Sequence, residues 1–309
     1  SGCGVVPERV EAWTAGEVTK PALTAAEAPT LFEDYDRRNN AAIVETAKSG
    51  DPKAWANADT EVVLDHAQFS THLASLRNDK TVHGTMTHTA DQLWAPEFAG
   101  YPMYAITSST LAVKGEKALA PDYRHVSLWL RSSSTAPWLL AGSAGTTTAL
   151  PRPLPASEGA APTADDRAQA KSGAEAIMAY LRTAELGKVT TNDALRSLAE
   201  GRSFDSRSGH KVTVDWYHPG AEAQVGIGGS VRAVRVSGGV LAHVSLLGRE
   251  TYDAKEGGYV SWNDPDYAEA LGELGVLERL SRDIGVSVVY LVAPDQSVRV
   301  LASNWDVVG

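Results

Sequence analysis

The sequence predicts an α+β protein of two domains, in each of which helices pack on a curved antiparallel sheet. First, a chain of 309 residues with 43% hydrophobic content is long enough for two cores, at roughly 150 residues per domain. Second, each half begins with apolar residues spaced for helices and continues with apolar residues that alternate as in strands. Third, residues 151–155 read Pro-Arg-Pro-Leu-Pro, a stiff and extended segment that divides the chain almost in half.

These boundaries define four parts of the chain. Residues 1–24 contain Pro7, Pro21 and scattered charges without an apolar period, which is typical of a tether. We therefore expect a tether at 1–24, a first domain at 25–150, a linker at 151–164 and a second domain at 165–309.

The first domain begins with a long helix. Phe32, Tyr35, Asn39 and Ile43 fall on one stripe at helical spacing, and the Gly-Asp-Pro sequence at residues 50–52 ends the helix. Since Asn39 lies on the apolar stripe, we expect its amide to be buried and hydrogen-bonded to the backbone of the sheet.

A second helix follows, and then the sheet. Phe69, His72, Leu73 and Leu76 have the spacing of one helical face, which predicts that His72 is an interior, hydrogen-bonded histidine. The apolar period then changes to two. We expect an antiparallel meander, wrapped on the long helix, with strands at residues 82–90, 101–107, 125–131 and 138–143.

The second half repeats this order. Helices are predicted at 170–181 and 191–200, strands at 211–217, 223–227, 231–236 and 240–247, an inserted helix at 266–283, and a closing hairpin at 286–292 and 298–303. Shifted by 160 residues without gaps, the last hairpin of the first half matches this closing hairpin. The match favours a duplication, although shared strand composition is an alternative explanation.

Charge and histidine spacing exclude several classes of function. A net charge of −10, spread over both halves, argues against binding to nucleic acid or to an anionic membrane surface. His66 and His72 lie about 120° apart around a helix, and His83 and His88 point to opposite faces of a strand. Neither pair can converge on one ion, so we expect no metal and no cofactor.

Three short patterns resemble catalytic motifs but lack their context. The Ala-Gly-Ser-Ala-Gly sequence at 141–145 closes the meander, where a nucleophile elbow needs a turn from strand to helix. The Ser-x-x-Lys match at 208–211 precedes a strand, and the glycines at 226–229 fit a hairpin turn. We therefore predict no catalytic residue.

The aromatic residues give the candidate ligand site. In the first domain Trp94, Tyr101 and Tyr104, together with Met86 and His88, could line the open end of a sheet that curves around one helix. Core packing is the alternative explanation, because aromatic residues are large and favour strands. The ligand would be a small apolar or sugar-like molecule. In the second domain Trp216 and His218 end the first strand in a comparable position.

The single cysteine indicates where the protein resides. Cys3 follows Ser1 and Gly2 and precedes a polar tether, as at the end of a bacterial lipoprotein signal peptide. One acylated cysteine in a chain without other cysteines also suits an oxidising compartment. We expect lipidation at Cys3 and attachment to the outer face of the cell membrane by this anchor alone, since no segment has about 18 uninterrupted apolar residues.

Several motifs also resemble those of a known family. They are Tyr-Asp-Arg-Arg-Asn-Asn-Ala-Ala at 35–42, Trp-Ala-Pro at 94–96, Gly-Tyr-Pro-Met at 100–103 and Pro-Trp at 137–138. The chain is similar here to uncharacterised secreted lipoproteins of high-GC Gram-positive bacteria. The resemblance implies tandem cystatin-like or NTF2-like α+β domains and supplies no catalytic residue.

The sequence thus favours an extracytoplasmic, lipid-anchored protein that acts as a non-catalytic binding or interaction module. One alternative is an enzyme that uses the cavity between helix and sheet, with His88 or an aspartate as base. Another is a structural protein that docks on a second envelope protein. A space filled with apolar side chains under each sheet would exclude a ligand and an enzyme alike. An open cavity with a carboxylate and a histidine in hydrogen-bond reach would favour the enzyme.

Overall fold

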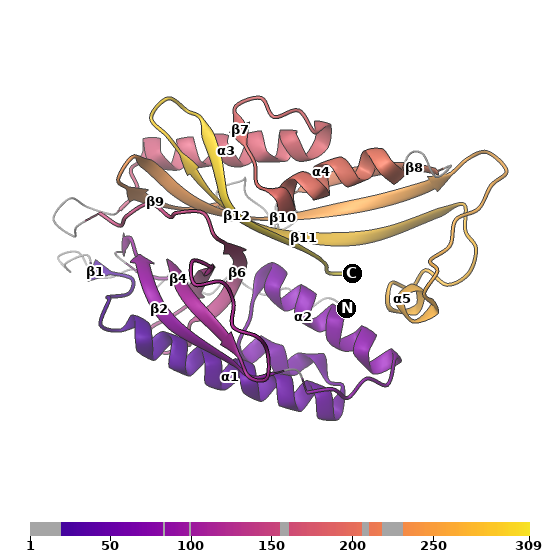
Figure 1. Cartoon of the computed structure of the whole chain (residues 1–309), viewed down its shortest axis with the longest axis horizontal. Coiled ribbons are helices and arrows are strands. Elements are labelled where there is room, and N and C mark those ends of the chain that lie inside the picture. The colour runs from indigo at the N-terminus through magenta and orange to yellow at the C-terminus, as the bar shows by residue number, and fades with distance from the viewer. Residues whose placement is uncertain (1–19, 83, 99, 155–160, 206–209, 218–230) are drawn as a thin grey trace.

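The computed structural model describes residues 20–82, 84–98, 100–154, 161–205, 210–217 and 231–309 (Figure 1). It confirms the predicted α+β class with antiparallel sheets and few helices. The predicted lipidation residue Cys3, the site residue His218 and the strand expected at 223–227 lie outside the described residues.

The first half contains a helical layer and a meander, in the order expected. The helices are α1 (Ala28–Ser49), the 3-10 helix η1 (Pro52–Asn57) and α2 (Glu61–Leu76). The sheet has the antiparallel order β2-β4-β5-β6. Its strands are β2 (Met86–Trp94), β4 (Met103–Val113), β5 (Arg124–Arg131) and β6 (Leu139–Thr146), and β1 (Lys20–Pro21) pairs separately with β3 (Glu97–Phe98).

The second half places two helices over a larger sheet. The sheet has the order β7-β12-β11-β10-β8, and β9 pairs with the other end of the long strand β10. Its elements are α3 (Ala164–Thr183), β7 (Val189–Thr190), α4 (Asp193–Asp205), β8 (His210–Tyr217), β9 (Val231–Val236), β10 (Gly239–Ala254), α5 (Pro265–Ala270), β11 (Arg279–Val292) and β12 (Val298–Val307).

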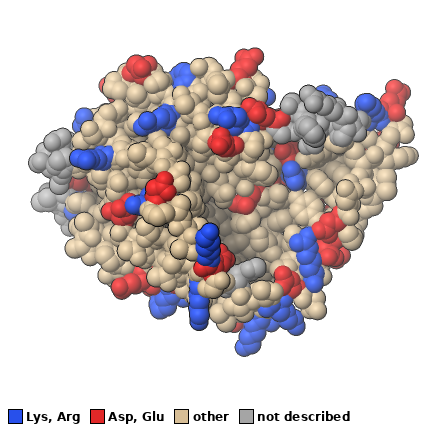
Figure 2. Space-filling model, in the orientation of Figure 1, with Lys and Arg blue, Asp and Glu red and all other residues tan. Residues whose placement is uncertain are grey.

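The two sheets lie face to face, with α1 outside one and α3 and α4 outside the other (Figure 1). Trp94 and Leu128 of the first sheet pack with Leu241 and Leu301 of the second in one buried cluster, the inter-sheet core. Helix α2 contacts β6 and also β10, β11 and β12, so it bridges the halves. Charged side chains of both signs are interspersed on the face in Figure 2, which is hollowed near its middle.

Helix α3 lies close to the second sheet because small residues face it. A Cβ atom on Gly173 would come within 2.7 Å of the Tyr290 ring, and the Tyr290 hydroxyl donates to the carbonyl of Ala170 at 2.6 Å. Buried apolar side chains, among them Ile177 and Leu181, fill the space between the helices and this sheet.

The inserted helix predicted at 266–283 is largely wrong. Only α5 is helical there, and β11 already begins at Arg279. Gly272 and Gly275 have φ angles of 70° and 99°, in the left-handed region, which ends the helix. Residues from Arg279 onward pair with β10, so the ladder overrides the local helical pattern.

The interior position predicted for His72 is also wrong, because this side chain is exposed. Helix α2 instead buries Val62, Phe69 and Thr71. The Thr71 hydroxyl accepts a hydrogen bond from Trp55 Nε1 at 2.8 Å. The buried face of α2 therefore includes the polar residue Thr71, so the spacing of hydrophobic residues alone predicts the wrong buried face.

A glycine on β6 permits the closest approach between the sheets. A Cβ atom on Gly142 would lie 2.3 Å from the ring of His243, which is fully buried on β10. Burial, with a smaller contribution from the nearby Arg232 charge, lowers the pKa of His243 to about 3, so its ring is neutral. A neutral imidazole thus occupies the space that the missing side chain leaves.

We expect Gly142→Ala to lower the free energy of unfolding by about 1–3 kcal/mol, because the added methyl overpacks the inter-sheet core. Urea unfolding of Gly142→Ala, His243→Ala and the double variant measures the effect. In the double variant the methyl enters space vacated by the ring, so its loss should be smaller than the sum of the two single losses. Additive losses would contradict a contact between these two residues.

Candidate functional site

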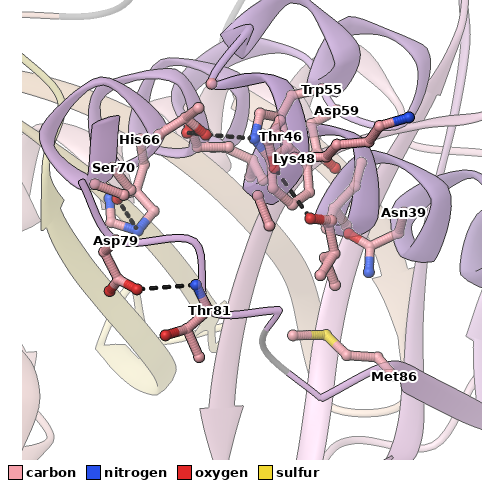
Figure 3. A pocket seen from close by; sticks show the side chains of 18 of the residues that line it. Asn39, Thr46, Lys48, Trp55, Asp59, His66, Ser70, Asp79, Thr81 and Met86 are labelled. Carbon is pink, nitrogen blue, oxygen red and sulfur yellow. Dashed lines mark hydrogen bonds between the residues drawn. The ribbon is translucent and has the colours of Figure 1, made fainter. Parts of the chain in front are cut away.

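A cavity of about 540 Å³ lies between the helices of the first half and the face of their sheet that is turned away from the second sheet (Figure 3). Helices α1 and α2 form two walls, η1 contributes Trp55, and strands β2, β4, β5 and β6 form the floor. The floor and the walls include apolar side chains, among them Ile43, Val63, Met86, Leu111 and Leu140.

An aspartate on α1 orients the histidine on β2. Asp36 Oδ1 lies 2.5 Å from His88 Nδ1, and Asp36 Oδ2 accepts the backbone N–H of His88 at 2.8 Å. The imidazole also stacks on Phe32, with ring centres 5.6 Å apart and planes inclined by 16°. Since the carboxylate accepts at Nδ1, this nitrogen carries the hydrogen, and Nε2 is left as the acceptor of the neutral ring. His88 lines the cavity.

A second histidine of the floor lies beside it. The ring of His125, on β5, is 5.3 Å from that of His88 between centres. Burial, and to a smaller extent the nearby His88, lowers the pKa of His125 to about 3. Two imidazoles of the floor therefore face the cavity, besides His66 on α2, and His125 is neutral at physiological pH.

A buried carboxyl group occupies the wall formed by η1 and α1. Asp59 is 3% exposed, and the Tyr35 hydroxyl lies 3.3 Å from its Oδ1 and 3.4 Å from Oδ1 of Asn39. Burial raises the pKa of Asp59 to about 7, although the Tyr35 hydrogen bond and the charge of Arg38 act in the opposite direction. This group therefore changes its charge near neutral pH.

The prediction that Asn39 bonds the backbone of the sheet is wrong, because its neighbour Asn40 makes this contact. Asn40, not Asn39, bonds the sheet backbone: its Nδ2 donates to the Met86 carbonyl at 2.9 Å, and its Oδ1 accepts the Met86 N–H at 2.8 Å. Asn39 is buried, lines the cavity, and its Nδ2 has no hydrogen-bond partner in the described part of the chain.

Of the predicted ligand-site residues that the structure describes, only Met86 and His88 line the cavity. Trp94 points into the inter-sheet core, where its Nε1 donates to the Pro151 carbonyl at 3.1 Å. Tyr104 also faces the second half, and its hydroxyl donates to the carbonyl of Ala233 at 2.6 Å. Tyr101 is buried, with the Arg131 guanidinium 6.0 Å from its ring centre.

Trp216 packs in the core of the second half. A Cβ atom on Gly248, directly opposite on β10, would lie 2.6 Å from the indole ring, so the ring covers this glycine. Its position matches the core-packing explanation considered for the aromatic residues.

Among the cavity residues that sequence reasoning missed are Tyr35, Trp55, Asp59 and His125. Tyr35 shares the helical stripe with Asn39, and His125 begins a predicted strand, so both positions carried a signal. Trp55 and Asp59 lie in and after η1, where no periodic pattern indicates which side chains turn inward. In the described residues no group of three or more histidines, cysteines and carboxylates is placed to hold a metal ion.

We expect Asp59→Asn to change how stability depends on pH. In the folded protein Asp59 keeps its proton up to about pH 7, whereas the unfolded group loses it near its ordinary pKa of 3.8. Both states are protonated below that pKa. As pH rises from about 4 to about 7, this residue therefore destabilises the fold by up to ~1.4 kcal/mol per pH unit.

Denaturant unfolding of both proteins between about pH 4 and pH 8 tests this expectation. The variant should gain stability relative to the parent protein as pH rises through that window, because an amide binds no proton and keeps an acceptor for Tyr35. A difference in stability that stays constant with pH would show that Asp59 is ionised in the folded state.

Comparison with known proteins gives no identity for the chain. No family model matches it, and no curated protein matches it in sequence. Its function must therefore be inferred from the cavity itself.

Proposed function

We propose that the cavity of the first half binds a small, mainly apolar molecule, and that the protein acts as an extracytoplasmic binding module without catalysis. The observation that carries the proposal is an unfilled space of about 540 Å³ whose accessible lining is mostly apolar, with polar side chains from both helices and from the floor. Ligand sites in proteins typically have volumes of about 300–1,000 Å³ and this kind of lining.

The contrast between the halves supports this assignment. In the second half, buried side chains fill the space between the helices and the sheet. In the first half, α1 is held to strand β2 through Asp36 and Asn40, and Phe32 and Tyr35 pack on Trp129, but the rest of the sheet face beneath borders an unfilled cavity. The second half shows that helices can pack on a sheet of this kind without leaving a cavity.

A second candidate is an enzyme that uses His88 as a base. It is favoured by one observation, the Asp36 carboxylate 2.5 Å from Nδ1 of a histidine that lines a cavity. This arrangement fixes the ring and leaves Nε2 to take a proton from a bound molecule. An enzyme would convert the bound molecule into a product, whereas a binding module would release it unchanged.

We also propose that the halves are tandem copies of one cystatin-like or NTF2-like domain. Each half closes with an antiparallel hairpin that carries a β-bulge. The bulge leaves Ala141 of β6 and Leu301 of β12 without a directly opposite partner. These residues are separated by 160 positions, the same shift that relates the two hairpins in sequence.

Lipidation at Cys3 and a location on the outer face of the cell membrane belong to the same proposal. They are supported by the Ser-Gly-Cys sequence and by the lack of any other cysteine in the chain. In the described residues no helix is both long and apolar enough to cross a membrane.

We expect Ala47→Phe to weaken ligand binding, because Ala47 lines the cavity and the new ring would occupy part of it. The probe is N-phenyl-1-naphthylamine, a neutral apolar dye whose fluorescence rises in apolar surroundings. Ala41→Phe is the matched control, since Ala41 lies on the same helix and is exposed. The dye should bind the parent protein and Ala41→Phe equally, and Ala47→Phe at least tenfold more weakly. Equal binding by all three would exclude this cavity as the binding site.

We expect Cys3→Ser to release the protein from membranes. The chain would be expressed behind a lipoprotein signal peptide in a Gram-positive host, and its distribution between membrane and soluble fractions compared with that of the variant. The parent protein should be found in the membrane fraction and the variant in the soluble fraction, because only the thiol can be acylated. An unchanged membrane fraction would refute the anchor.

A further inference from the structure

We infer that the ligand of this cavity carries a hydroxyl group, which is held at the buried end of the cavity between Asn39 and His88. The inference rests on the proposed binding function and adds the chemical class of the ligand. It is carried by two polar groups whose hydrogen bonds within the protein are incomplete.

The first group is the amide of Asn39. The residue is 4% exposed and lines the cavity, and its Nδ2 has no hydrogen-bond partner in the described part of the chain. A buried donor without an acceptor typically costs about 1–3 kcal/mol, so such a group indicates a partner that occupies the cavity. The amide thus offers an N–H to an acceptor atom of the ligand.

The second group is the imidazole of His88. Its Nδ1–H donates to Asp36, and the described residues provide no hydrogen-bond partner for Nε2. The stacked ring of Phe32 and the carboxylate fix the plane of the imidazole. His88 therefore offers a fixed acceptor to the cavity that it lines.

Helix geometry places the two groups close to each other. Asn39 follows Asp36 by three residues on α1, so both lie on neighbouring turns of the same face. Asp36 in turn holds His88. A donor and an acceptor at one end of the cavity match a single hydroxyl group, which accepts from Asn39 and donates to His88.

Charge selects a neutral ligand rather than a carboxylate. The two lysines that line the cavity, Lys48 and Lys80, are exposed and lie near the C-terminal ends of α1 and α2. The buried end instead has Asp36 behind His88 and Asp59 beside Tyr35. The nearest cation to Asp59, Arg38, is already bonded to Asp34 and to the Trp138 carbonyl, so a buried anion there would face carboxyl groups.

The test measures displacement of N-phenyl-1-naphthylamine by four naphthalenes of the same ring size. Naphthalene has no polar group, 2-methoxynaphthalene has only an acceptor, 2-naphthol has a hydroxyl, and 2-naphthoate is an anion. We expect 2-naphthol to bind the parent protein at least tenfold more tightly than naphthalene, and 2-methoxynaphthalene to lie between them. We expect 2-naphthoate to bind most weakly.

Two variants locate the effect, Asn39→Leu and His88→Gln. Each should reduce the preference for 2-naphthol over naphthalene at least fivefold. Thr46→Val is the control, because Thr46 also lines the cavity but its hydroxyl already donates to the Ala42 carbonyl at 2.8 Å. The preference is a ratio measured within one protein, so a variant of lower stability still gives an answer as long as it binds naphthalene.

The outcomes separate this inference from the proposed function. If the dye and all four naphthalenes fail to bind, the proposed binding function is wrong. If they bind but 2-naphthol is no tighter than naphthalene, a water molecule satisfies Asn39 and the hydroxyl inference alone is wrong. Tightest binding by 2-naphthoate, or a preference that survives in Asn39→Leu and His88→Gln, would also overturn it.

Discussion

The first half depends on polar side chains of α1 that take the place of a neighbouring strand at the edge of its sheet. Strand β2 pairs with β4 on one side only. On its other side, Asn40 satisfies both backbone groups of Met86, and Asp36 accepts the N–H of His88. An open sheet edge leaves unpaired backbone groups that invite aggregation, and here a helix covers them. Phe32 and Tyr35 of α1 also pack against Trp129 of β5 in a buried cluster. The cavity occupies the part of the sheet floor that this cluster leaves uncovered.

The same bonds orient a polar group of the cavity. Asp36 both holds the backbone of β2 and orients the His88 ring, so attachment of the helix and orientation of the imidazole cannot be separated. In the second half α3 instead packs closely on its sheet through Gly173, and side chains fill the space. If the halves are copies of one domain, one copy has kept a site and the other has become a packed core.

Periodicity predicted the order of elements because burial on one face leaves a regular trace in the sequence. It did not predict which of two adjacent asparagines meets the sheet, since Asn39 and Asn40 differ by about 100° around the helix and the axial rotation of α1 is set by contacts with β2. It failed at residues 266–283 because pairing with β10 outweighs local helical spacing. Most aromatic residues proposed for the site pack between the sheets or in a core, since composition cannot say which face of a strand turns toward which layer.

The central claim, that a ligand enters the cavity under the first sheet, is tested most directly at the methionines. The chain has three, of which Met86 lines the cavity, Met103 is buried on β4 and Met178 lies in the core of the second half. With ¹³C-labelled methionine methyl groups, titration with 2-naphthol should shift the Met86 signal and leave those of Met103 and Met178 in place. A Met86 signal that does not move while the compound binds elsewhere would contradict the account.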